Sequence, residues 1–236
     1  MANILHLETT TLNCGVAIFC DSTVVSSRSN CEEGYSHAEN IMPFIDEVFI
    51  ECGLSKSDLD AVSVSGGPGS YTGLRIGVAT AKGICHALSI PLISVDTLSV
   101  LKHEAVSLMP GKDTYVSMLD ARRMEVYTKT FTKDHSSEVK ALVVDTTTKS
   151  VFDEHKTICF IGDGVEKCEE ILAFDGRDFI KTYPKSEYAI DLVRRAFEKR
   201  DFVDIASYEP MYLKAFKAGV AKDPFNLRDK TSRFTE

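Results

Sequence analysis

The chain has 236 residues, of which 44% are hydrophobic and 26% are charged, and its formal net charge is −8. This composition is typical of a soluble globular protein with one large or two modest domains. The negative charge argues against strong nucleic-acid binding by this chain alone. No apolar run approaches membrane-spanning length, and the first residues are too few for a signal peptide, so we expect no membrane association and a cytoplasmic location.

The seven cysteines fit that location, because they are odd in number, scattered and without a C-x-x-C pair. Several of them lie on apolar stripes, which is typical of small core residues in a reducing compartment. The sequence therefore predicts no disulfide framework.

The first expected elements are three strands at residues 3–8, 14–20 and 23–28, followed by a long helix at 38–52. The helix has a wide apolar face, contains Pro43 and ends at Gly53, which is in the position of a C-terminal cap. Such a wide face is more than one sheet usually needs, so we expect part of it to contact another helix.

Residues 61–89 are expected to form a strand, a glycine loop and a helix that begins at Thr72. The loop, Gly66-Gly67-Pro68-Gly69-Ser70, has neither Walker, nucleophile-elbow nor dinucleotide-fingerprint spacing. What remains is a run of backbone amides that leads into a helix N-terminus. Two interpretations stay open: a cradle for a phosphate, or a tight turn without a ligand.

The helix at 72–89 carries a stripe of mostly small side chains beside its apolar stripe. A mid-helix glycine costs roughly 1 kcal/mol relative to alanine, so Gly77 implies the close approach of another backbone. We expect a second helix there, from this chain or from a partner. On this interpretation Gly77→Leu weakens partner binding while the chain stays folded.

The first half of the chain ends with a strand at 91–95 and a helix at 96–108, which lead to Pro110-Gly111, the best boundary between two lobes. The second half then repeats the first in outline. We divide the chain into a lobe at 1–109, a lobe at 110–205 and a return segment with a mobile tail at 206–236. The tail is locally basic from Lys214 onward. The expected later elements are a hairpin (114–119 and 124–132), strands at 142–146, 157–161 and 179–182, and helices ending at Leu172 and Lys199.

The expected hairpin at 114–119 and 124–132 has a charged tip. Asp120, Arg122 and Arg123 are either residues of the cleft between the lobes or a solvated loop tip. We favour the solvated tip, because loop tips are ordinarily polar.

The glycine-loop stretch SGGPGSYTGLRIGVATAKG resembles the signature of the bacterial TsaB (YeaZ) family, and the likeness continues through PLISVDTLSVL, MLDARRMEVY and YLK. It implies an α/β fold of the actin, sugar-kinase and heat-shock ATPase type, with two lobes in βββαβαβα order. It also implies a non-catalytic partner of TsaD, with TsaE as regulator and tRNA as indirect partner, in the formation of threonylcarbamoyladenosine next to the anticodon. No cofactor is then required by this chain, and ATP with Mg²⁺ belongs to the complex.

The resemblance places Glu8 where an acidic residue at the end of the first strand positions a metal. Relatives usually have Asp there, and the longer Glu side chain moves the carboxylate outward, which matters for octahedral Mg²⁺. Glu8 could equally just end a strand. The candidate phosphate or nucleotide loop consists of Glu8, Thr9, Thr10, Gly66, Gly67, Gly69, Ser70 and Thr72.

The metal ligands of the catalytic relative are missing from this sequence. In TsaD the stretch equivalent to residues 95–101 resembles V-H-H-M-E-G-H, whose two histidines bind the metal, and here Thr97 and Leu101 stand in their places. His103-Glu104 suggests a zincin, but Ser107 occupies the position of its second histidine. We therefore expect no catalytic residue and no metal site.

The resemblance also assigns the two long helices, 38–52 and 72–89, to a pairing surface for TsaD, or for a second copy of the chain in isolation. The alternative is that both helices pack only on each other and on the sheet. The interface residues expected from this assignment are Ile41, Met42, Phe44, Ile45, Phe49, Gly73, Gly77, Thr80 and Ile84.

Two enzymatic alternatives remain. An active ATPase or phosphotransferase would show ATP turnover that Glu8→Ala abolishes. A peptidase would need a metal or an activated nucleophile, and neither spacing is present in the sequence.

Overall fold

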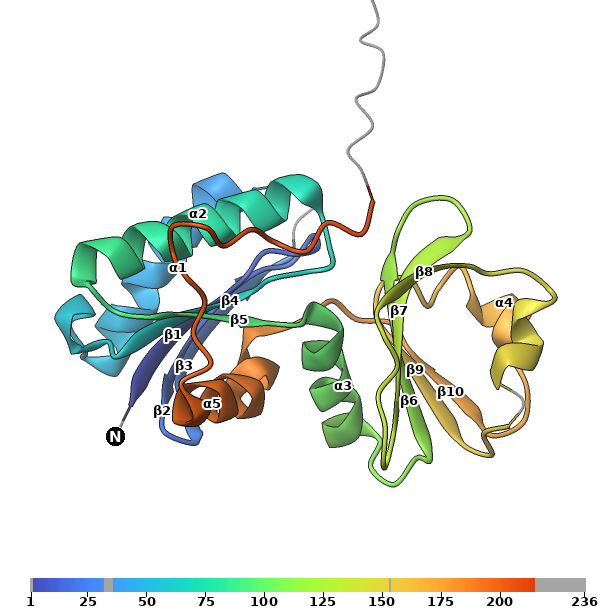
Figure 1. Cartoon of the computed structure of the whole chain (residues 1–236). Helices are drawn as coiled ribbons and strands as arrows, with labels where there is room; N and C mark the ends of the chain where they lie inside the picture. The colour runs from blue at the N-terminus through green and yellow to red at the C-terminus, as the bar shows by residue number, and fades with distance from the viewer. Residues whose placement is uncertain (1, 32–35, 153, 215–236) are drawn as a thin grey trace, which may run out of the picture.

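The computed structural model describes residues 2–31, 36–152 and 154–214, which form two lobes, each built on a five-stranded sheet (Figure 1). The elements of the first half are β1 (Asn3–Glu8), β2 (Cys14–Cys20), β3 (Thr23–Asn30), α1 (His37–Cys52), the 3₁₀ turn η1 (Lys56–Asp58), β4 (Ala61–Ser65), α2 (Tyr71–Leu88), β5 (Leu92–Val95) and α3 (Thr97–Leu108). Those of the second half are β6 (Thr114–Asp120), β7 (Glu125–Thr132), β8 (Lys140–Val143), η2 (Thr148–Phe152), β9 (Ile158–Ile161), α4 (Glu169–Leu172), β10 (Arg177–Ile180), η3 (Ser186–Ala189) and α5 (Ile190–Lys199).

The two sheets have the same strand order. The first runs β3-β2-β1-β4-β5, and the second runs β8-β7-β6-β9-β10. In both, the first hairpin is antiparallel and the later strands join the sheet in parallel. This duplication confirms the predicted two-lobed α/β fold with mixed sheets and flanking helices. The second half has the short turn η2 where the first half has its long helix α1.

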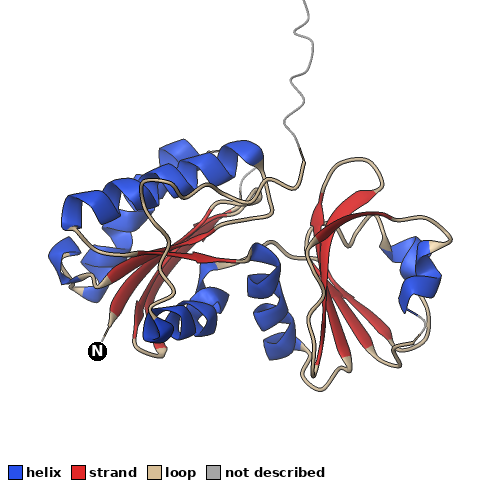
Figure 2. Ribbon diagram, in the orientation of Figure 1, coloured by secondary structure: helices blue, strands red, loops and turns tan. Residues whose placement is uncertain are grey.

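The helices are exchanged between the halves (Figure 2). Helices α1 and α2 cover one face of the first sheet, whereas α5, from the end of the second half, covers its other face. Helix α3 lies between the lobes, with Leu98 and Leu101 in the core of the second sheet and Val100 in that of the first. The predicted boundary at 109/110 thus follows a helix that already belongs to both cores.

Local signals were interpreted correctly at several helix ends. Gly53 caps α1 in the left-handed conformation, as predicted, and Ser55 and Asp58 form a capping box at η1. The predicted start at Thr72 was wrong, because Ser70 is the N-cap of α2 and its side chain accepts a hydrogen bond from the Gly73 amide. Within the described ranges no helix is both long and apolar enough to cross a membrane. Of the predicted return segment with its mobile tail at 206–236, residues 215–236 lie outside the described residues.

Candidate functional site

The glycine loop leaves the core at the end of β4 and leads into α2. Gly67 has φ +116°, a conformation that glycine adopts far more readily than other residues. A Cβ atom on Gly66 would lie 2.1 Å from Ser94 Oγ and 2.2 Å from the Tyr208 hydroxyl. The loop therefore needs glycine because other parts of the chain pack directly against its backbone.

The turn between β1 and β2 packs directly against this loop. The Ser70 amide donates to the Thr10 carbonyl oxygen at 2.6 Å, and a Cβ on Gly69 would lie 2.4 Å from that oxygen. On α2, a Cβ on Gly73 would lie 2.0 Å from the Thr9 carbonyl oxygen, and one on Gly77 would lie 2.3 Å from Thr9 Oγ1. The close approach along the small-residue stripe comes from this turn and not from the predicted second helix.

Glu8 is fully buried behind the same turn. Its carboxylate accepts hydrogen bonds from the Thr10 amide at 2.8 Å, the Thr10 hydroxyl at 2.5 Å and the Ser65 hydroxyl at 2.5 Å. Burial raises the pKa of Glu8, and the hydrogen bonds from Ser65 and Thr10 oppose the rise. Both carboxylate oxygens serve the chain itself, so the side chain does not fit the expected role of a Mg²⁺-positioning group.

His6 and Ser65 complete a buried polar row with Glu8. His6 Nδ1 lies 3.1 Å from Ser63 Oγ, and Nε2 lies 3.5 Å from Ser65 Oγ. Burial lowers the pKa of His6 to about 3, so the ring is neutral. Although serine, histidine and glutamate meet here, Ser65 is fully buried and donates to Glu8 instead of to the histidine. A substrate cannot reach this hydroxyl, which argues against the peptidase alternative.

A strap formed by residues 203–214 crosses from the first lobe to the second. It begins with a bridge between Val203 and Leu92, and the Met211 amide then donates to the Gly66 carbonyl oxygen at 2.8 Å. Tyr208 and Ser94 share a hydroxyl hydrogen bond of 2.6 Å. Lys214 reaches the carboxylate of Glu125 in the second lobe. The strap covers Gly66 and Gly67. Its described part from residue 206 onward lies in the predicted return segment, but the contacts with the glycine loop were not predicted because the two segments are remote in sequence.

The expected interface residues divide into two groups. Ile41, Ile45 and Phe49 belong to the core of the first lobe, and Gly73 and Gly77 are buried against Thr9. These five cannot contact a partner in this conformation, which corrects the expectation. Met42 is 45% exposed, and Phe44, Thr80 and Ile84 are half-buried. Beside them Ala79, Gly83 and Ala87 are exposed on α2.

Thr97 and Leu101, in the places of the relative's metal ligands, are both fully buried. Leu101 packs in the core of the second lobe, where its methyl group lies near the backbone of Gly162. Next to them, Glu104 pairs with Lys185 at 2.5 Å, and His103 lies 3.8 Å from Asp191. His103 thus joins α3 to α5, and Glu104 joins it to the segment that leads into α5. Among the described residues, no group of three or more histidine, cysteine or acidic side chains could hold a metal ion.

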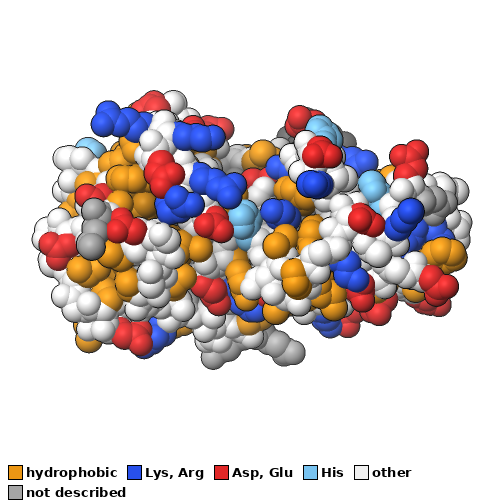
Figure 3. Space-filling model, turned by 90° about the horizontal axis from the view of Figure 1, so that it is seen from below, with side chains coloured by type: hydrophobic (Ala, Val, Ile, Leu, Met, Phe, Trp, Pro, Cys, Tyr) orange, Lys and Arg blue, Asp and Glu red, His pale blue; other side chains and the backbone are white. Residues whose placement is uncertain are grey.

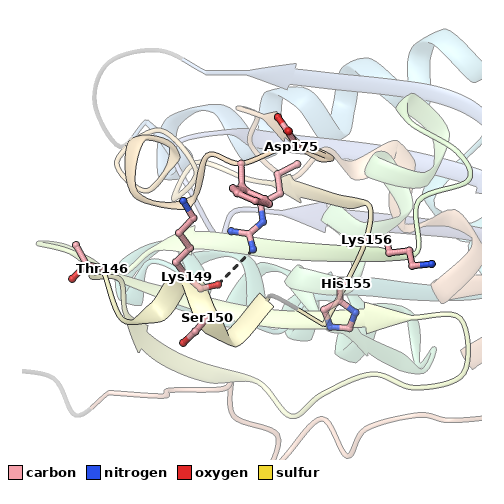
Figure 4. Close-up of a pocket in the computed structure, with 8 residues that line it drawn as sticks. Thr146, Lys149, Ser150, His155, Lys156 and Asp175 are labelled. Carbon is pink, nitrogen blue, oxygen red and sulfur yellow. Dashed lines mark hydrogen bonds between the residues drawn. The ribbon is translucent and has the colours of Figure 1, made fainter.

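Two cavities lie away from the glycine loop. One, of about 380 Å³ and located between the lobes, is lined by Asn13, Ser29, Cys31, Asp163, Lys181, Thr182, Tyr183 and Lys185. Burial raises the pKa of Asp163 to about 6. The other, of about 570 Å³ at the end of the second lobe, is lined by Thr146, Lys149, Ser150, His155, Lys156, Phe174, Asp175 and Arg177 (Figure 4). There Lys149 and Arg177 hydrogen-bond backbone carbonyl oxygens, so they primarily fix the end of α4.

The charged tip of the β6–β7 hairpin is exposed at Arg122 and Arg123, as expected for a solvated tip. Asp120 pairs with Lys167, whose ammonium group also donates to the carbonyl oxygens of Arg123 and Glu125 at 2.7 Å. Sequence reasoning missed this anchoring of the turn.

The sequence and the fold are both similar to those of known proteins. The family model described as "TsaD: tRNA N6-adenosine threonylcarbamoyltransferase" matches residues 33–193. The Escherichia coli tRNA threonylcarbamoyladenosine biosynthesis protein TsaB is 28% identical over 89% of this chain and 94% of its own length. The Bacillus subtilis protein of the same name is 33% identical over 53% of each chain, so the match spans about half of that relative. YeaZ from Pseudomonas aeruginosa superimposes with a TM-score of 0.75 at 23% identity, over 90% of this chain and 100% of that one.

Proposed function

Because the chain belongs to the TsaD family and, within it, to the TsaB (YeaZ) group, we propose that it is a partner subunit in the formation of threonylcarbamoyladenosine in tRNA. It binds a TsaD-type transferase and holds it in a competent state, while TsaE and a separate synthase of the threonylcarbamoyl donor complete the system. The chain supplies no catalytic group. ATP and Mg²⁺ act at the level of the complex.

One observation carries the proposed non-catalytic role. Leu101, which stands in the place of a metal-binding histidine in the relative's motif, is fully buried in the core of the second lobe. A leucine side chain has no atom that can coordinate a metal, and its neighbours are apolar. The chemistry of the transferase therefore has to come from the partner.

The docking surface follows from what α1 and α2 leave exposed. Met42 lies on α1, and Ala79, Gly83 and Ala87 lie on α2. A Cβ on Gly83 would have no neighbour within 4 Å, so nothing in this chain requires glycine at that position. Small side chains let a second helix approach closely, which fits the corresponding face of a similar lobe. The same face would support a two-fold homodimer when the transferase is absent.

The alternative, an ATPase or phosphotransferase, has less support. The turn at Thr9 and Thr10 packs against the glycine loop, and both carboxylate oxygens of Glu8 are used within the chain. A phosphate would have to displace the Thr10 carbonyl oxygen to reach the Ser70 amide. No contact described above favours nucleotide turnover.

The test is reconstituted tRNA threonylcarbamoylation with TsaD, TsaE and the synthase from the same organism, with the chain present or omitted. We expect modification to require the chain. Gly83→Leu should weaken the complex at least tenfold and lower modification to match, because the new side chain stands on the docking face. Ser107→Leu, on an exposed position of α3, is the matched control and should bind normally.

Equal modification with and without the chain would overturn the partner role. Normal complex formation by the Gly83→Leu variant would keep that role but remove α2 from the interface. Gly83→Leu replaces the earlier Gly77→Leu test, because Gly77 is buried against Thr9 and a leucine there would disturb the fold.

A further inference from the structure

The turn at the tip of the β6–β7 hairpin holds two arginines in an unfavourable backbone conformation. Arg122 has φ +69° and Arg123 has φ +51°, and in the described part of the chain they are the only adjacent non-glycine residues with positive φ. Side chains with a Cβ are disfavoured there, and such outliers persist where the surroundings hold them. Glycine or asparagine would suit this turn better, so the arginines have no local structural advantage.

Two lysines from distant segments hold the turn from its carbonyl side. Lys167 donates to the carbonyl oxygens of Arg123 and Glu125, each at 2.7 Å, and pairs with Asp120. Lys214, at the end of the strap, donates to the Ala121 carbonyl oxygen at 3.1 Å and pairs with Glu125. The turn is therefore fixed in position relative to both lobes.

These ion pairs use the two carboxylates of the turn and leave both arginines available. Arg122 and Arg123 are exposed, and neither guanidinium group has a hydrogen-bond or ion-pair partner among the described residues. The tip thus gathers four cations around three carboxylates, because the Asp163 carboxylate also lies here and accepts a hydrogen bond from the Asp120 amide at 3.0 Å. This excess of cations lies on a chain whose net charge is −8. By contrast, the face shown in Figure 3 carries both signs interspersed.

We propose that this turn binds backbone phosphates of the RNA on which the complex acts; the inference rests on the proposed function and names a contact within it. A guanidinium group offers paired donors that match a phosphate, and phosphate contacts set the position of a nucleic acid without reading its sequence. Because the chain as a whole is acidic, an RNA strand is attracted only where cations exceed carboxylates. An interface with a protein would need an apolar centre, and in the described part of the turn and its neighbouring strand β8 the exposed large apolar side chains are those of Met124 and Val143.

The experiment measures binding of an unmodified tRNA transcript to the complex of this chain with its TsaD-type partner over a range of salt concentrations. Complex formation is first verified by size-exclusion chromatography. The double variant Arg122→Gly/Arg123→Gly suits the turn's backbone, so its melting temperature should equal or exceed that of the wild type. Its affinity should fall roughly 10- to 100-fold at about 0.1 M salt, and the slope of log K against log salt should fall by about two.

Two further variants separate charge from structure. Arg122→Lys/Arg123→Lys keeps both charges and should keep most of the salt slope. Lys133→Ala/Lys140→Ala removes the same charge from exposed positions elsewhere in the second lobe and should change affinity less than about twofold.

Unchanged affinity and slope in the glycine variant would overturn the RNA contact while leaving the partner role intact. Loss of the protein complex by that variant in the absence of RNA would also overturn it, because the turn would then dock the protein partner. Failure of the wild-type chain to form any complex would overturn the proposed function first, and with it this contact.

Discussion

The two lobes share one strand order, but the turn of their first hairpin is buried in the first lobe and exposed in the second. In the first lobe, the turn after β1 is buried under α2, and Glu8 at the end of β1 is fully buried. In the second lobe, the turn after β6 is exposed, and Asp120, which ends the equivalent strand, is half exposed and paired with Lys167. The same topology thus gives an internal polar cluster in one half and a charged surface turn in the other.

The second lobe also has a glycine loop, Gly162-Asp163-Gly164, which follows β9 as the loop at 66–70 follows β4. The helix that follows each loop accounts for the difference. Helix α2 has 18 residues and carries Gly73 and Gly77 where it meets Thr9, so it can lie directly on the turn. The equivalent α4 has four residues and contributes no such face. A long glycine-bearing helix therefore turns the hairpin end into core, whereas a short helix leaves it for contacts with other molecules.

The largest expected effect on this difference between the lobes is that of Gly73→Ala in α2. The new Cβ would lie 2.0 Å from the Thr9 carbonyl oxygen, so the helix or the turn must move. We expect a loss of about 3 kcal/mol of unfolding free energy, because overpacking a fixed backbone costs about 1–3 kcal/mol or more. The loss of unfolding free energy can be measured by urea unfolding. Gly83→Ala, on the open side of the same helix, should instead stabilise by up to about 1 kcal/mol. Similar changes in unfolding free energy at both positions would contradict the burial of the β1–β2 turn under α2.

The second prediction concerns the pH dependence of Glu8→Gln. Burial raises the pKa of Glu8, so its contribution to stability is complete below the unfolded pKa and is lost as pH rises through the folded pKa. The glutamine cannot ionise, and its amide can donate to Ser65 while its carbonyl oxygen accepts from Thr10. The free energy of unfolding of the variant, relative to that of the wild type, should therefore increase as pH rises from about 4.5, by at most about 1.4 kcal/mol per pH unit. Urea unfolding at several pH values measures the gain, and parallel pH profiles would contradict it.

The smallest expected effect is that of Asp120→Asn in the second lobe. The pair with Lys167 lies at the surface, where the Asp120 side chain is 49% exposed, so its contribution is screened by solvent. We expect a loss of no more than about 1 kcal/mol, measured by thermal unfolding against the wild type. A loss as large as that of Gly73→Ala would mean that both hairpin ends are equally part of the core.

Much of the fold could be predicted because its signals are local. The bounds of β1, β2 and β4 match the expected ranges, since these short, mostly apolar segments end at clear turn residues. The N-cap of α2 could not be chosen from the sequence, because Ser70 and Thr72 are both good caps. The choice depends on the hydrogen bond between the Ser70 amide and Thr10, which is a contact between segments distant in the chain.

The candidate interface was harder to predict than the fold. An apolar stripe that faces the core and one that faces a partner have the same composition, so Ile41 and Ile45 could not be told apart from Met42. The small-residue stripe correctly indicated a close backbone approach, but not that the approaching segment was the turn at Thr9. The anchoring of the charged hairpin tip was invisible for a similar reason, since Lys214 and Glu125 are 89 residues apart.

The exchange of helices between the halves has a consequence for synthesis of the protein. Phe19 and Ile93 on the first sheet pack in a cluster that also contains Val100 of α3 and Val193 of α5. A nascent chain that ends before residue 190 therefore lacks part of the cover of that face, although every strand of the first lobe has already been made. We therefore expect the core of the first lobe to be completed only after the α5 segment of the second half has been made.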